Sequence, residues 1–374
     1  MLLSELLRKE HNNIDILRLI AACAVIFAHA DTVLGNTPTD FIYDFLRFDY
    51  SGHVAVKLFF FLSGLVVTNS LLSKRNIFQF AVARICRIMP ALAVVLGLWA
   101  FVLGPMLTTL SLNVYFSSST AYAYFFEGIL LKITYALPGV YATMPNSSIN
   151  ASIWVVPYEM FAYLWLGIFF IAGVFRFRMA PVLLILFLLY ETASGSSRIF
   201  SNDMMAAGVN KFLLCFAFGA LLVVFKDRLR ITLPLVVGLC AAYWLSRGTM
   251  AAELFFYPAL CITSLYISSL RLALLLKPTS DISYGVYLWG WPAQQLMHLW
   301  FPDEGKIFNW VTATVLALLF GYASWHLIEK HFIRWGGAVG KLSWSEMRCR
   351  RIDANLGRKA VCRIFAMFGC NSGR

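Results

Sequence analysis

Long apolar runs separated by short polar stretches fill most of the sequence. They cover residues 14–33, 53–72, 89–110, 152–173, 179–192, 208–226, 231–246, 250–270, 281–300 and 308–330. An α-helix needs about 20 apolar residues to cross roughly 30 Å of hydrocarbon, and most of these runs approach or reach that length. The pattern therefore predicts an all-α, polytopic membrane protein with about 10 transmembrane helices.

One further apolar segment complicates the count of crossings. Residues 121–140 are interrupted by Glu127 and Lys132, so we expect this segment to be re-entrant or interfacial. This segment is a rival to the two shortest runs, 179–192 and 231–246, as a membrane-spanning helix.

The composition excludes a water-soluble protein, and the distribution of charge predicts an orientation. The chain is 60% hydrophobic and 13% charged, whereas soluble domains carry roughly 25% charged residues. The net charge of +12 arises from Lys and Arg that gather on alternate loops, so we expect no nucleic-acid partner. Because cytoplasmic loops are rich in Lys and Arg, both termini are predicted to be cytoplasmic, in agreement with an even number of crossings.

The sequence suggests a single membrane domain with a short appendage. We divide it into a transmembrane domain, 12–334, and a basic cytoplasmic tail, 335–374. Residues 360–368 can lie on anionic lipid as an interfacial helix, or the tail can be disordered. The first apolar run lacks a cleavage pattern and is expected to be a signal anchor. The eight cysteines show no CxxC or Cys/His spacing, so no metal site is predicted.

The first apolar run carries two ionisable residues, Arg18 and His29. Such residues are costly inside a membrane and are candidates for function. Eleven residues advance an α-helix by about 1100°, roughly 20° beyond three turns, so the two side chains share one face and lie about 16 Å apart along the axis. The alternative is that Arg18 extends to lipid headgroups and that His29 is an interfacial residue.

Two arginines, Arg84 and Arg87, enter the third run from its cytoplasmic side. Residues three apart on a helix face the same side, and two guanidinium groups so placed suit the phosphates of a nucleotide-containing ligand. The alternative is an anchor that only sets the orientation of the helix.

Carboxylates form a third group of candidates. Glu159 follows Pro157 at the start of the fourth run, where a carboxylate must be paired, protonated or in contact with water; otherwise it is a helix-start residue favoured by the helix dipole. Glu329 and His326 near the end of the last run are further candidates for function, and the alternative, which we favour, is an ion pair at its cytoplasmic end. For the block 281–292 we expect mainly packing.

Taken together, these blocks resemble the integral membrane acyltransferase-3 family, which includes bacterial O-acetyltransferases of surface polysaccharides. The resemblance covers most of 12–334. It rests on Asp15-Ile-Leu-Arg18 with His29, the block 52–64 that ends in Ser63-Gly64, Phe80 with Arg84, Arg87 and Pro90, Ser152-Ile-Trp154 through Glu159, the block 282–288, and Leu327-Ile328-Glu329. The chain departs from the family pattern at Gly290, His331 and Val155.

The resemblance implies an enzyme of a bacterial inner membrane with acyl-CoA, in the first place acetyl-CoA, as donor. The acceptor it implies is a hydroxyl of a polysaccharide or lipid-linked sugar at the outer face. Arg84 and Arg87 would hold the phosphates of the donor, Arg18 would guide its pantetheine arm, and His29 would act as general base. Glu159 would orient His29 or bind the acceptor, and Ser63 is the candidate for a covalent acyl-enzyme.

Two other functions fit the same pattern of intramembrane ionisable residues. A transporter or flippase of a polar or lipid-linked substrate also places such groups on a water-filled path. A membrane sensor could retain the scaffold without the chemistry. Neither function predicts turnover of acyl-CoA, and the transporter does not readily explain the paired arginines together with a deep histidine.

Overall fold

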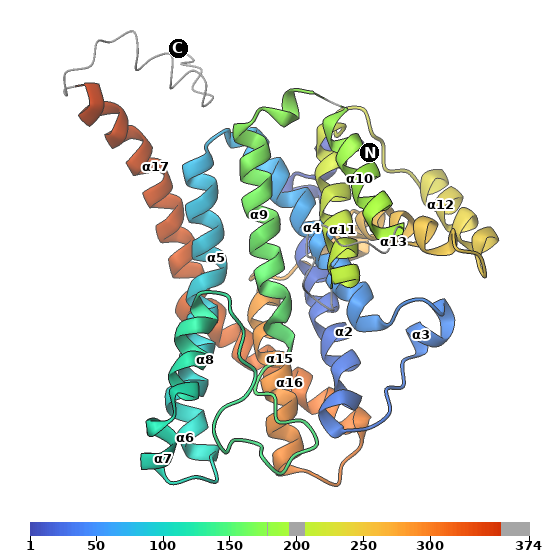
Figure 1. The fold of residues 1–374 in the computed structure, drawn as a ribbon. Coiled ribbons are helices and arrows are strands. Elements are labelled where there is room, and N and C mark those ends of the chain that lie inside the picture. The colour runs from blue at the N-terminus through green and yellow to red at the C-terminus, as the bar shows by residue number, and fades with distance from the viewer. Residues whose placement is uncertain (178, 194–205, 353–374) are drawn as a thin grey trace.

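The computed structural model describes the backbone of residues 1–177, 179–193 and 206–352, and the side chains of these residues except 193, 206–207 and 342–352. Across this part of the chain every regular element is helical (Figure 1). The prediction of an all-α architecture is therefore confirmed. The predicted interfacial helix at 360–368 lies outside the described residues.

Five helices of the described residues are long and apolar enough to cross a membrane. They are α2 (Ile14–Leu34), α4 (Ser51–Lys74), α5 (Ile77–Leu98) with its extension to Leu107, α9 (Val156–Ile171) with the short turn that precedes it, and α16 (Lys306–Ser324), which continues into α17 (Lys330–Ile352). The shorter helices of the membrane domain are α10 (Ala180–Ala193), α11 (Ala206–Val224), α12 (Leu233–Ser246), α13 (Ala252–Ser268) and α15 (Ser283–Trp300).

Each of the ten predicted runs thus contains a helix of the described structure. The number of crossings stays a prediction, because four of the apolar helices have only 10–17 described residues. The remaining elements are short: α1 (Leu3–Leu6), α3 (Phe41–Leu46), α6 (Gly104–Leu107), α7 (Leu112–Ser117), α8 (Ser119–Ile129) and α14 (Arg271–Leu275).

The structure moves the predicted start of the third helix and shows how the segments 121–140 and around 334 are folded. The third helix begins at Ile77, twelve residues earlier than expected, because the Asn76 side chain caps it by accepting a hydrogen bond from the backbone N–H of Gln79 at 2.9 Å. In the segment 121–140 only α8 is helical, and at 11 residues it is too short to span. At the other end of the chain, α17 continues without a break through residue 334.

Helices α4 and α11 approach each other with their backbones in contact. A Cβ atom added at Gly64 would overlap the carbonyl group of Phe216, and one added at Gly219 would overlap the backbone around Phe61 and Leu65. Small residues allow such close approach in membrane proteins, where packing drives helix association. This contact fixes the position of α4, which carries several of the polar residues described below.

Helices α2, α4 and α15 pack side by side at the centre of the molecule. Glycines permit this packing: a Cβ atom at Gly52 of α4 would lie 2.9 Å from the Cβ of Ala28, and one at Gly290 of α15 would lie 2.8 Å from the side chain of Ile26. All three helices contribute side chains to the cavity described below.

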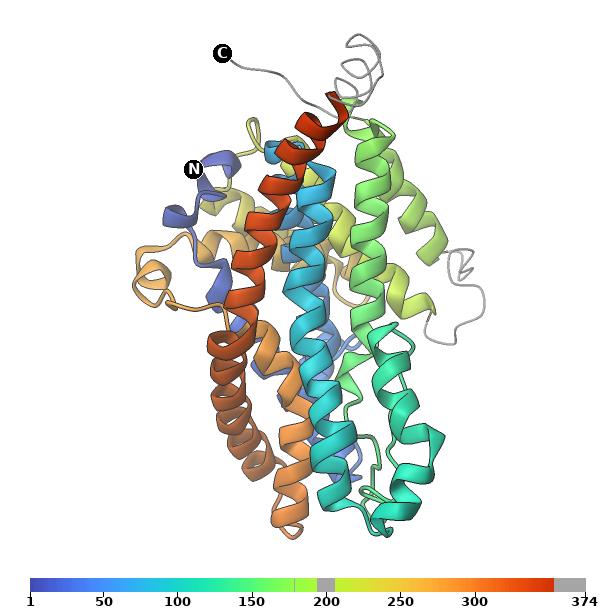
Figure 2. The same cartoon turned by 90° about the vertical axis from the view of Figure 1, so that its left-hand side faces the viewer.

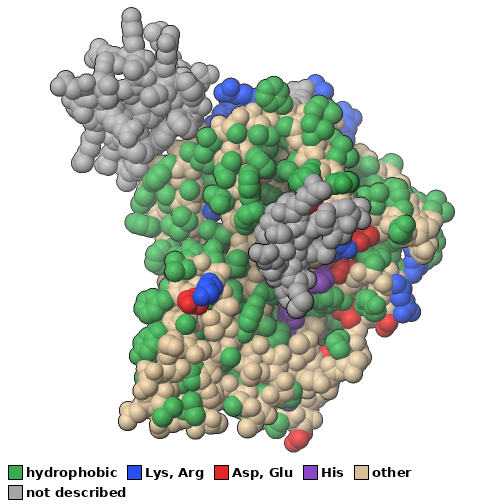
Figure 3. Space-filling view, viewed as in Figure 1, with side chains coloured by type: hydrophobic (Ala, Val, Ile, Leu, Met, Phe, Trp, Pro, Cys, Tyr) green, Lys and Arg blue, Asp and Glu red, His purple; other side chains and the backbone are tan. Residues whose placement is uncertain are grey.

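The two ends of the described chain lie toward the same end of the bundle, as Figures 1 and 2 show for α1 and the last turns of α17. The N-terminal residues are held by backbone hydrogen bonds to the segment after α11, from Leu3 N–H to Leu229 at 2.9 Å and from Ile231 N–H to Met1 at 3.0 Å. Which side of a membrane this end faces stays a prediction. Figure 3 shows a largely apolar face with basic side chains along its upper edge and a group of acidic, basic and histidine side chains at mid-height.

Candidate active site

A cavity of about 80 Å³ lies between α2, α4, α5, α9 and α15. Five candidate residues from four separate sequence blocks line it: Arg18, Ser63, Arg84, Arg87 and Glu159. The other lining residues are Val56, Phe59, Phe60, Ile88, Val155, Val156, Tyr163, Ser283, Tyr284 and Tyr287. We call this space the arginine cavity.

Two of the arginines share one carboxylate, Asp281. An Nη atom of Arg87 lies 2.7 Å from Asp281 Oδ2, and an Nη atom of Arg18 lies 3.6 Å from the same oxygen. Arg87 also lies 3.5 Å from the buried carboxylate of Glu329. The expected ion pair of Glu329 is thus formed with Arg87, and Asp281, for which we expected a packing role, bridges two helices.

Arg84 differs from the other two arginines because, among the described residues, no carboxylate lies within ion-pair distance of it. Its guanidinium group lies 5.9 Å from the ring centroid of Tyr163. Arg84 also lines a second, smaller cavity at the turn between α4 and α5, together with Lys74, Asn76 and Gln79. It therefore stands between the arginine cavity and the basic end of the molecule, with a charge that is available to an anion.

Glu159 belongs to a small hydrogen-bonded group in the wall of the arginine cavity. Its Oε1 atom accepts a hydrogen bond from the hydroxyl of Tyr163 and another, at 3.1 Å, from Ser63 Oγ. Tyr163 follows Glu159 by four residues on α9, so the two side chains lie on one face of that helix. In the described structure both hydrogen bonds of Glu159 go to these residues and neither goes to His29.

His29 does not line the arginine cavity. It lies three turns further along α2, and its ring meets that of Trp291 on α15 edge to face, with centroids 5.0 Å apart. Trp291 is fixed in turn, because its indole N–H donates a hydrogen bond to the Ser148 carbonyl at 2.9 Å. Tyr287, one turn before Trp291, lines the cavity, so α15 leads from the cavity to His29.

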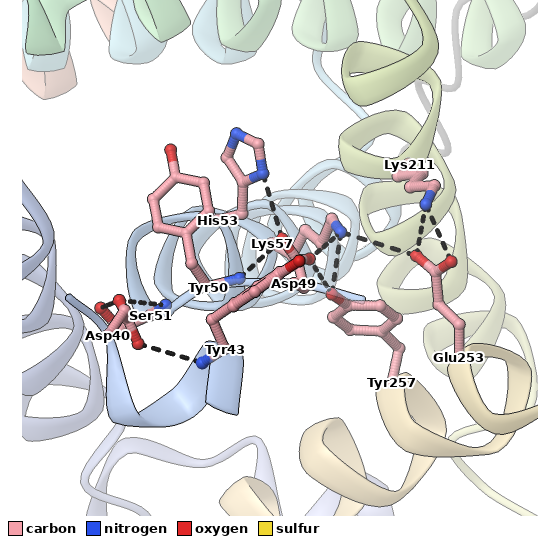
Figure 4. A network of polar contacts seen from close by, with 10 residues as sticks. All are labelled: Asp40, Tyr43, Asp49, Tyr50, Ser51, His53, Lys57, Lys211, Glu253 and Tyr257. Carbon is pink, nitrogen blue, oxygen red and sulfur yellow. Dashed lines mark hydrogen bonds and ion pairs between the residues drawn. The ribbon is translucent and has the colours of Figure 1, made fainter. Parts of the chain in front are cut away.

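A second polar cluster lies at the other end of this path. Figure 4 shows its members, which we call the outer network: Asp49, His53, Lys57, Lys211, Glu253 and Tyr257. Asp49 accepts hydrogen bonds from Lys57 and Tyr257, and lies 3.1 Å from His53 Nδ1. Glu253 lies 3.7 Å from Lys57 and 2.7 Å from Lys211. The network links α4, α11 and α13.

Asp49, which precedes α4, is ionised within this network. Burial on its own would raise the pKa of the carboxyl group, but the hydrogen bond with His53 and the positive charge of Lys57 outweigh that effect and hold the pKa well below its ordinary value. An ionised carboxylate can only accept, so His53 donates through Nδ1–H. This hydrogen bond occupies Nδ1 and leaves the second ring nitrogen of His53 for another partner.

Sequence reasoning missed several of these residues. Lys57 stands inside an apolar run and is 2% exposed, so the rule for intramembrane charges would have found it. Tyr163 could have been found from its spacing to Glu159. The pairing of Asp281 with Arg87, 194 residues away, leaves no signal in the local sequence. Among the described residues, no group of three His, Cys, Asp or Glu side chains is arranged to hold a metal ion.

Comparison with known proteins places the chain in a family. Residues 11–326 match the family model described as an acyltransferase domain. Over 348 residues the chain is 25% identical to the O-acetyl transferase of Shigella phage Sf6, an alignment that covers 86% of this chain and 96% of that protein. Over 364 residues it is 26% identical to nodulation protein 10 of Rhizobium leguminosarum bv. viciae, covering 85% of this chain and 92% of that protein. No solved structure is significantly similar. Because the family model spans most of the sequence, this chain belongs to the acyltransferase 3 family and is an acyltransferase.

Proposed function

We propose that the protein moves an acyl group, in the first instance acetyl, from acyl-CoA on the cytoplasmic side of a bacterial inner membrane to a hydroxyl of an extracytoplasmic carbohydrate. The observation that carries this proposal is the arginine cavity, in which three guanidinium groups meet the hydroxyl of Ser63 and the carboxylate of Glu159. The name of the phage Sf6 relative supports an acetyl group and an oxygen acceptor.

The donor would enter at the basic end of the molecule. Arg84 lines both the arginine cavity and the small cavity beside Lys74, and it has no carboxylate partner among the described residues. Guanidinium groups bind phosphate through paired hydrogen bonds. We therefore assign the phosphates of CoA first to Arg84, with Arg87 and Arg18 beside it. The last two are already balanced by Asp281.

The transfer of the acyl group would take place beside His29. The acceptor hydroxyl attacks the thioester carbonyl, a C–O bond forms and the C–S bond breaks. His29 takes the hydroxyl proton as general base and returns it to the thiolate of CoA, so that the imidazole is regenerated. This step requires the acyl group to travel from the cavity along α2, a distance of about 16 Å between the levels of Arg18 and His29.

Ser63 offers a second route within the same function. Its hydroxyl donates to Glu159 at 3.1 Å, and a carboxylate in that position can remove the proton of a serine nucleophile. The acyl group would then rest on Ser63 before it reaches the acceptor. Trapping of an acylated Ser63 peptide would establish this route, whereas its absence during turnover would favour direct transfer.

Two assays test this proposal, one on cell-surface glycans and one on the purified protein. Mass spectrometry of cell-surface glycans from cells with and without the gene should reveal the loss of one acyl group. The purified protein in lipid nanodiscs should transfer label from acetyl-CoA to glycan from the deletion strain. His29→Ala should fold, insert and bind acetyl-CoA but transfer nothing, and Arg84→Ala should weaken binding of acetyl-CoA.

His298→Ala is the matched control, because His298 lies at the end of α15 outside the arginine cavity and the outer network, and it should transfer as the wild type does. Unchanged transfer by His29→Ala would remove His29 as the base. Identical glycans with and without the gene, together with movement of an unmodified substrate across vesicles, would instead establish a transporter.

A further inference from the structure

Tyr50 and His53 form a pair of rings at the point where α4 meets α2. Their centroids lie 4.2 Å apart with an interplanar angle of 40°. Gly52 makes room for this arrangement, since a Cβ atom there would lie 2.7 Å from the Tyr50 ring and 2.9 Å from Ala28. Ala28 directly precedes His29 on α2. The ring pair therefore borders the proposed base.

Each ring of the pair carries a polar atom without a partner. Among the described residues, neither the hydroxyl of Tyr50 nor the second ring nitrogen of His53 forms a hydrogen bond. Figure 4 shows both atoms on the side of the pair that faces away from Asp49. Since buried or half-buried polar groups are normally satisfied, two free polar atoms side by side indicate a place for a ligand.

The charged side chains around His53 balance one another, which leaves His53 and Tyr50 to form hydrogen bonds with a ligand. Two carboxylates, Asp49 and Glu253, are balanced by two ammonium groups, Lys57 and Lys211. With Nδ1 of His53 in contact with Asp49, the second ring nitrogen of a neutral imidazole can accept a hydrogen bond, and the Tyr50 hydroxyl can donate one.

This combination matches one class of ligand, a sugar. A sugar hydroxyl can donate to the second ring nitrogen of His53 and accept from Tyr50, while the C–H face of a sugar ring can pack against an aromatic ring such as that of Tyr50. Because His53 belongs to the outer network and the ring pair borders His29, the pair joins that network to the proposed base.

We propose that Tyr50 and His53, with His53 held in place by Asp49, bind the carbohydrate acceptor and direct its hydroxyl toward His29. This inference rests on the proposed function. It assigns the acceptor to residues for which the sequence offered no role, and it separates acceptor binding from donor binding at Arg84.

The test measures transfer by the full chain in nanodiscs, with labelled acetyl-CoA and cell-surface polysaccharide purified from the deletion strain. The amide of Asn reproduces the position of Nδ1 of histidine, so His53→Asn keeps the contact with Asp49 and loses the outward nitrogen. We expect its KM for polysaccharide to rise about fivefold to tenfold, the effect of one lost hydrogen bond, with kcat and the KM for acetyl-CoA within about twofold of wild type. Tyr50→Phe should behave in the same way.

Two further variants separate binding from folding. The amide of Gln extends to the position of the outward nitrogen, so His53→Gln should recover part of the acceptor affinity that His53→Asn loses. His298→Asn should change neither KM. An unchanged KM for polysaccharide in both His53→Asn and Tyr50→Phe would overturn the proposal, and so would a loss of kcat at constant acceptor KM, which would make His53 a base. If the wild type transfers no label, the proposed function itself fails.

Discussion

Asp281 is the carboxylate on which the arginine cavity depends, and its removal tests that dependence. Asp281→Asn keeps the size of the side chain and can still accept the hydrogen bond from Ser283 Oγ, which measures 2.6 Å. It removes the negative charge that lies 2.7 Å from Arg87 and 3.6 Å from Arg18. Glu329 then remains as the single carboxylate in contact with Arg87 among the described residues.

The expected cost follows from how far these side chains are exposed. Loss of one partner of a buried pair costs about 3–5 kcal/mol, and exposed pairs contribute about 0.2–1 kcal/mol. The side chains of Arg87 and Asp281 are 17% and 16% exposed, so solvent screens the pair only in part. We therefore expect Asp281→Asn to lower the free energy of unfolding by about 2–3 kcal/mol.

A double-mutant cycle isolates the interaction from other effects of the substitution. The free energy of unfolding would be measured by denaturant titration in mixed micelles for Asp281→Asn, Arg87→Gln and the double variant, and again with Arg18→Gln. The coupling energy should exceed about 1 kcal/mol for Arg87 and be smaller for Arg18, because Coulomb energy falls with distance. A coupling to Arg87 below about 0.5 kcal/mol, the limit of additivity, would refute the account of the arginine cavity given above.

Three further substitutions test other parts of the molecule. Gly64→Ala should destabilise the protein by about 1–3 kcal/mol because its methyl group overlaps the backbone of α11. The control Gly238→Ala, with no atom within 4 Å of the added Cβ, should be neutral or stabilising by up to about 1 kcal/mol. Equal melting temperatures of the two variants would contradict the close contact between α4 and α11. Tyr115→Phe removes the 2.8 Å hydrogen bond to the carbonyl of Ala100 and should cost about 0.5–1.5 kcal/mol in the same titration. The lowered pKa of Asp49 stabilises the folded state above the unfolded pKa of about 3.9. This contribution to the free energy of unfolding should be constant near neutral pH and decline as the pH falls below that value, and the decline should be shallower in Asp49→Asn. Parallel pH profiles of wild type and variant would argue against an ionised Asp49.

The sequence predicts those features that depend on one helix. The position of Arg18 and His29 on the same side of α2 follows from the helical repeat, and Glu159 with Tyr163 follows from a spacing of four. The helices themselves follow from apolar runs, because a backbone in hydrocarbon must satisfy its own hydrogen bonds.

Contacts between distant helices could not be predicted in the same way. Asp281 meets Arg87 because α15 and α5 pack together, and nothing near either residue specifies that neighbour. The same reason hides the outer network, in which Lys57, Lys211 and Glu253 come from three helices. Each is conspicuous as a charge in an apolar segment, but only the fold identifies its partner.

Two aromatic side chains in the lining of the arginine cavity have a consequence for the membrane itself. Phe59 on α4 lies edge-on to Tyr287 on α15, with centroids 6.1 Å apart, and both side chains line the cavity. If donor and acceptor come from opposite compartments, as proposed above, the protein must never hold a continuous column of water, since protons would leak along it and dissipate the gradient that powers the cell. On that proposal these two rings would have to move aside for the acyl group and pack together again once it has passed.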